Sequence, residues 1–191
     1  MDYYNEIKNK LMDNELYSRV KDYSKERYRM ITYYEIGKLL NEAGRVYGEN
    51  IIGEYSKKLI IDVGKKYNKR TLFRMRQFYK LFSNEKVSPV VSQFNQHMTN
   101  KVAPLVTQLT WSHALILLPI KDIDKINYYI NQISERNLSK RQLETIIKNK
   151  EYERLDNDTK RKLIVNNKTN VKDLVKNPII MKIYPKKYCK D

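Results

Sequence analysis

The sequence contains only one cysteine and two histidines among its 191 residues. The single thiol, Cys189, cannot form an internal disulfide, so a reducing, cytoplasmic setting fits the chain. One cysteine and two histidines, His97 and His113, give no cluster at the spacing of zinc ligands. A glycine-rich phosphate-binding motif is also missing from the sequence. We therefore expect a protein without a metal ion or another cofactor.

Long apolar runs are absent as well. The longest spans 114–120, far short of the roughly 20 residues that a transmembrane helix needs. The first residues, MDYYNEIKNK, mix both charge signs and contain no apolar core of a secretory signal. The sequence therefore predicts neither export nor a membrane partner.

Glycine and proline are scarce, with five of each, and no segment shows a sustained alternation of apolar and polar residues. These observations favour a mainly α fold, a helical bundle with helix–turn–helix-like units. We expect one or two polar helices within 2–29 and another helix over 30–43, which ends at Gly44. The stretch 83–108 holds two of the prolines, and we expect an irregular connector or a short ribbon there.

Acidic residues are outnumbered. The 22 Asp and Glu stand against 38 Lys and Arg, which gives a net charge of +16 and a pI near 9.7. This balance favours a polyanionic partner, nucleic acid above all. However, the excess is mostly lysine, and the 18 asparagines beside it indicate the bias of an AT-rich genome. The position of the arginines is more informative than the total charge, because three of the 11 arginines lie within 70–76.

The segment 47–82 concentrates this positive charge, with nine Lys and Arg against three Asp and Glu. Apolar residues recur at helical spacing in its first half. Gly64 then provides a turn, and Asn68 can cap a second helix that continues to Phe82. Two helices joined by a short turn, with cations on the outer face of the second, fit a DNA major groove.

The outer face of that second helix is the predicted DNA-binding site. At about 100° per residue, Arg70, Arg74 and Gln77 project away from the apolar stripe, and we expect them to contact base edges. Arg76 lies nearer to the stripe, and its stem is expected to pack along the core. The residues expected to contact phosphates surround this face: Lys57, Lys58, Lys65, Lys66 and Lys69.

A second helical unit begins at Trp111. We expect Trp111 to anchor the core and His113 to be a structural or capping residue. Ser139 and Gln142 match a capping box, in which each side chain bonds the backbone N–H of the other residue. The helix that follows is expected to run to about Leu155, which gives a second helix–turn–helix outline.

Seven short motifs occur in one order along the chain: Tyr34-Glu35-Ile36-Gly37, Tyr47-Gly48, Ser56-x-x-Leu59, Leu72-x-x-Met75-Arg76-x-Phe78-Tyr79, Leu109-x-Trp111-Ser112-His113, Leu138-Ser139-x-Arg141-Gln142-Leu143 and Tyr152-Glu153-Arg154-Leu155. In this order they resemble the YhcG-type N-terminal domain over residues 15–156. The resemblance implies a helical, helix–turn–helix-type DNA-binding module. In that family the module normally precedes a nuclease domain of the PDDEXK fold, in bacterial restriction and mobile-element defence systems.

The sequence departs from the family pattern after this domain. A PDDEXK site needs an Asp and a Glu-x-Lys on adjacent strands, which hold a divalent metal ion. No Glu follows Leu155, and Glu6 to Lys8 is the only Glu-x-Lys in the chain. We therefore expect two parts, a helical domain over 1–156 and a basic tail over 157–191. The nuclease would be missing because the chain is a natural short form, a decayed gene, or a subunit with a separately encoded nuclease.

The predicted function is thus a non-enzymatic DNA-binding module that acts on duplex DNA, with or without a separate nuclease or restriction-modification subunit. A homodimer would be usual for a reader of palindromic sites. The alternative is a protein adaptor that recruits a nuclease or methylation complex, in which Phe73 and Leu81 would matter more than the arginines. A third option is an enzyme subunit active only with a partner chain. The basic tail either adds phosphate contacts or has no role.

Overall fold

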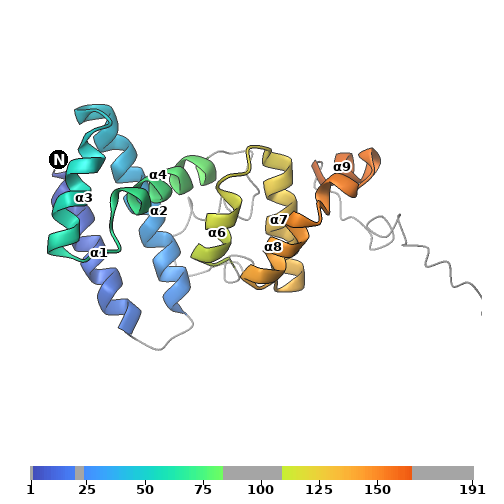
Figure 1. Ribbon diagram of the computed structural model, residues 1–191, viewed down its shortest axis with the longest axis horizontal. Coiled ribbons are helices and arrows are strands. Elements are labelled where there is room, and N and C mark those ends of the chain that lie inside the picture. The colour runs from blue at the N-terminus through green and yellow to red at the C-terminus, as the bar shows by residue number, and fades with distance from the viewer. Residues whose placement is uncertain (1, 20–23, 84–108, 165–191) are drawn as a thin grey trace, which may run out of the picture. The chain divides into compact units, whose positions relative to one another are not determined.

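The computed structural model describes residues 2–19, 24–83 and 109–164, and all regular secondary structure in these residues is helical (Figure 1). This confirms the mainly α fold predicted from the sequence. The connector expected over 83–108 lies outside the described residues except for Ser83, and so does most of the tail, 165–191. By its internal contacts the chain divides into two compact units, Met1–Ile146 and Ile147–Asp191.

Four helices form the core of the first unit: α1 (Tyr3–Arg19), α2 (Ser24–Tyr47), α3 (Ile51–Asp62) and α4 (Lys69–Phe82). The long helix α2 packs against each of the other three, and its most extensive contact is with α4 (Figure 1). Each helix contributes an apolar stripe to one cluster of buried side chains. Its members come from all four helices and the turn before α4, and include Ile7, Leu11, Ile36, Leu40, Ile52, Leu59, Tyr67, Leu72 and Met75.

Two glycines inside α2 allow α4 to pack closely. A Cβ at Gly37 would lie 2.2 Å from the carbonyl oxygen of Met75, so only glycine permits this approach of the two helices. A Cβ at Gly44 would lie 3.4 Å from Nη2 of Arg76. The prediction that the helix ends at Gly44 was therefore wrong. Gly44 serves packing, and α2 continues to Tyr47, where Gly48 follows with a φ of 82°.

The turn between α3 and α4 agrees with the sequence prediction. Gly64 follows the end of α3 with a φ of 153°. The side chain of Asn68 accepts a hydrogen bond from the backbone N–H of Thr71 at 3.1 Å, which caps α4. Tyr67, the residue before this cap, is completely buried. The start of α4 is thus held by a cap and by a core side chain.

Helix α6 (Trp111–Leu117) packs onto α2. The Trp111 ring forms T-shaped contacts with the rings of Tyr33 and Phe78, with 4.8 Å and 5.5 Å between centroids. Thr110 and His113 form a reciprocal capping box at the start of α6, with 3.3 Å for each hydrogen bond. The predictions of Trp111 as a core anchor and His113 as a capping residue are therefore confirmed.

Helix α7 (Ile123–Arg136) ends at Asn137, which takes a left-handed conformation with a φ of 49°. The predicted capping box of Ser139 and Gln142 is present before α8 (Lys140–Lys148), since both of its hydrogen bonds form. The expectation of a helix to Leu155 was wrong, because Lys150 has a φ of 54° and stops the helix.

The second unit is described over 147–164 and contains the 3-10 turn η2 (Tyr152–Arg154) and helix α9 (Asn157–Ile164). Asp156 caps α9 by accepting a hydrogen bond from the backbone N–H of Thr159 at 2.7 Å. Lys160 lies 5.3 Å from the centroid of the Tyr152 ring. The beginning of the segment predicted as a basic tail is therefore helical.

Candidate nucleic-acid interface

Helix α4 carries positive charge along its whole length. Its sequence, KRTLFRMRQFYKLF, contains five Lys and Arg and no Asp or Glu. The buried side of the helix consists of Leu72, Met75, Arg76, Phe78 and Phe82. The opposite side is the surface on which a charged ligand can bind.

Five residues share that opposite side, because four of them follow one another at helical spacings of three and four and the fifth, Lys69, lies four residues before Phe73. We call them the α4 face: Lys69, Arg70, Phe73, Gln77 and Lys80. Of these, Phe73 is half-buried and the other four are exposed. The charge of this face is entirely positive.

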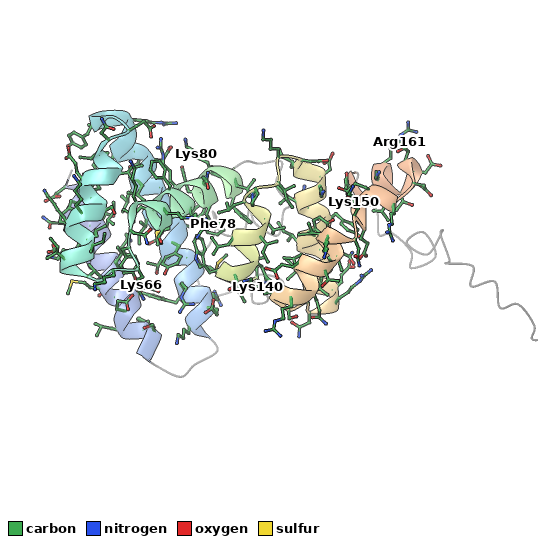
Figure 2. All side chains as sticks on the ribbon, in the orientation of Figure 1. Lys66, Phe78, Lys80, Lys140, Lys150 and Arg161 are labelled. Carbon is green, nitrogen blue, oxygen red and sulfur yellow. The ribbon has the colours of Figure 1, made fainter. Side chains whose placement is uncertain are left out.

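The three residues predicted to read bases differ in exposure. Arg70 and Gln77 are exposed on the α4 face, whereas Arg74 is half-buried at its margin. Lys80 was not among the predicted site residues, although it lies three residues after Gln77 and therefore on the same side. Figure 2 labels its side chain near the end of α4.

The five lysines predicted to contact phosphates are all exposed, but two of them, Lys58 and Lys66, contact residues of α1. Lys69 belongs to the α4 face, and its ammonium lies 5.8 Å from the centroid of the Phe73 ring. Lys58 is directed to α1, where its ammonium lies 5.4 Å from the centroid of Tyr4. Lys57 is exposed on α3, and Lys65 is exposed in the turn.

The fifth lysine, Lys66, is engaged by a carboxylate. It forms an ion pair with Glu15 of α1, and the hydroxyl of Tyr67 donates a hydrogen bond to the same carboxylate. Burial and this hydrogen bond raise the pKa of Tyr67. Burial would raise the pKa of Glu15, but the hydrogen bonds from Lys66 and Tyr67 outweigh it, and the pKa is lowered. The cluster ties the turn before α4 to α1 (Lys66 is labelled in Figure 2).

A second polar contact holds the middle of α4. The guanidinium of Arg76 is buried and pairs with both carboxylate oxygens of Glu49, in the junction between α2 and α3. Its Nε donates to Oδ1 of Asn41 at 3.4 Å. The hydrogen bond from Arg76 lowers the pKa of Glu49, and the same bond raises the pKa of Arg76. The predicted inward position of Arg76 is therefore confirmed.

Sequence reasoning did not identify Glu15, Tyr67, Asn41 or Glu49 as partners of the site. Glu15 and Tyr67 are 52 residues apart, and Arg76 is 27 residues from Glu49 and 35 from Asn41. No local pattern relates positions at such separations. The predicted inward position of Arg76 could have indicated that such a partner exists, because a buried guanidinium requires a carboxylate or several other acceptors.

In the residues that the structure describes, no three His, Cys, Asp or Glu side chains are arranged to hold a metal ion. The helices of the same residues include none that combines the length and the apolar character needed to cross a bilayer.

The fold and the site define a mainly α domain in which a cationic helix and the turn before it are held by a buried core and by two carboxylates. The chain belongs to the DUF1016 N-terminal domain family, the YhcG N-terminal domain, whose family model matches residues 17–154. This match confirms the resemblance predicted for 15–156. No curated protein and no solved structure matched the chain.

Proposed function

We propose that this domain binds duplex DNA through the α4 face. The supporting observation is that α4 has five cations and no carboxylate, while its only buried cation, Arg76, is already neutralised by Glu49. The remaining charges are on or beside the side that faces away from the core. Phosphates dominate the affinity of proteins for DNA, and an α-helix fits the major groove.

In this proposal the residues of the α4 face and its surroundings have different roles. Arg70 and Gln77 reach base edges, since they are exposed in the middle of the face. Lys69 and Lys80 contact phosphates at either end. Lys57 and Lys65 contribute from α3 and the turn.

The family context supports a second part of the proposal. We propose that the protein works beside a nuclease or restriction-modification subunit in the cytoplasm and that a partner chain supplies the catalytic residues. The domain would then deliver that partner to DNA. A homodimer would suit a palindromic site.

The experiment is fluorescence anisotropy with a labelled duplex over a series of salt concentrations. The double variant Arg70→Ala with Lys80→Ala is expected to bind roughly tenfold or more weakly, because losing the base-edge contact of an arginine costs about 1–3 kcal/mol and losing a phosphate contact weakens binding further. It should also have a shallower salt slope, by about 0.9 for each phosphate contact removed.

The matched control is Lys140→Ala with Arg141→Ala, which removes the same charge from exposed positions on α8. Equal losses in both double variants would show that only net charge matters and would contradict a site on α4. An absence of duplex binding by the parent at low salt would contradict the whole proposal and favour the protein adaptor. Phe73 and Leu81, the residues that the adaptor would use, are half-buried.

A further inference from the structure

The α4 face contains one aromatic side chain among its polar and cationic members. Phe73 lies three residues after Arg70 and four before Gln77, and so occupies the centre of the face. Its ring is half-buried and packs against the core cluster. A half-buried ring at the centre of a cationic surface can pack against the core and also contact a ligand that binds to that surface.

The surroundings of the ring restrict what it can contact. The ammonium of Lys69 lies over the ring, 5.8 Å from its centroid. The core cluster covers another part of the side chain. A nucleobase that stacked on the ring face under Lys69 would have to displace that side chain, whereas a methyl group needs only a small accessible part of the half-buried ring.

We propose that Phe73 contacts the 5-methyl group of thymine in the major groove of duplex DNA. This inference rests on the proposed function and adds the kind of base pair that the face prefers. Thymine is the base that presents a methyl group in the major groove, and apolar side chains, including Phe, recognise it there. Gln77 beside the ring would bond a neighbouring adenine, so that the site prefers A·T pairs at its centre, and Arg70 would contact the next base edge.

The test compares two alternating duplexes, one of dA and dT and the other of dA and dU. They differ in the methyl group and keep the same hydrogen-bonding groups. For the parent protein, each contacted methyl is expected to strengthen binding about fourfold, since burying one such group is worth about 0.8 kcal/mol. For Phe73→Ala, the two duplexes should bind equally.

Phe73→Leu tests the same idea with less effect on folding, because leucine keeps an apolar side chain against the core. It should retain part of the preference for thymine. The matched control, Gln77→Ala, should weaken binding to both duplexes and preserve the ratio between them. Circular dichroism verifies that each variant is folded.

The outcomes separate this inference from the proposed function. Duplex binding by the parent with no difference between thymine and uracil would overturn the methyl contact alone. A preference for thymine that survives in Phe73→Ala would overturn it as well. If Phe73→Ala lowers affinity for single-stranded DNA while the duplex ratio stays at one, the ring stacks on unpaired bases instead. An absence of duplex binding by the parent would refute both proposals.

Discussion

Gly37 shows at the scale of one residue how a missing methyl group determines the position of α4. A Cβ there would lie 2.2 Å from the carbonyl oxygen of Met75 and 2.8 Å from the Cβ of Tyr79. Neither of these atoms is at the end of a flexible side chain, so the helices themselves would have to separate. The sequence motif that includes Gly37 thus has a physical cause in helix packing.

We expect Gly37→Ala to destabilise the protein by about 1–3 kcal/mol, the usual range for overpacking a core. For a chain of this size, each kcal/mol lowers Tm by roughly 2–4 °C. The control is Gly53→Ala in α3, where a Cβ would meet only the end of Lys69, at 3.9 Å. This variant should be neutral or slightly more stable, because alanine favours helix over glycine. Thermal unfolding measures the Tm of both variants. Equal Tm values for Gly37→Ala and Gly53→Ala would contradict the role of Gly37 in helix packing.

At the scale of one element, α4 is held by contacts at two of its turns. Asn68 and the buried Tyr67 secure its beginning, and Arg76 secures its middle against Asn41 and Glu49. The hydrophobic stripe positions the helix, while the carboxylates of Glu15 and Glu49 determine which of the nearby cations remain available. Helix α4 can thus present its outer side in one orientation.

We expect Glu49→Gln to lower the Tm, since it removes the ion pair of the buried guanidinium of Arg76. The pKa of Glu49 is lowered by Arg76 from its ordinary value of 4.5. The stabilisation is therefore fully present above pH 4.5 and lost as the pH falls through the folded-state pKa of Glu49. The difference in Tm between parent and variant should be largest near neutral pH and shrink in acid.

The control is Glu54→Gln, which makes the same charge change at an exposed position of α3. It should alter the Tm little at any pH, as surface substitutions usually do. A difference in Tm for Glu49→Gln that stayed constant down to strongly acidic pH would contradict the assignment to the carboxylate.

At the scale of the whole molecule, the features that could be predicted from the sequence are those that depend on residues close together along the chain. The apolar periodicity predicted α3 and α4, and the caps at Asn68 and Ser139 formed as expected. The predicted end of α2 was wrong. Glycine often follows the last residue of a helix, but Gly44 lies inside α2 and packs against Arg76. Local patterns do not distinguish these two uses of glycine.

The candidate site was predictable in part for the same reason. Helical periodicity placed Arg70 and Gln77 on the exposed side of α4 and Arg76 toward the core. It could not show that Lys66 pairs with Glu15 or that Lys58 lies beside Tyr4, because both partners belong to α1. Assigning lysines by sequence proximity therefore grouped two side chains that contact α1 with Lys69, which belongs to the α4 face.

The most direct test of the central claim is an amide NMR titration of the full chain with a short duplex. We expect the largest shifts, in one contiguous set, at Lys69, Arg70, Phe73, Gln77 and Lys80, with smaller shifts in the turn that contains Lys65. Arg141 on α8 should be unaffected. Shifts concentrated in 165–191 or on α8, with α4 unchanged, would contradict the claim that α4 is the DNA-binding helix.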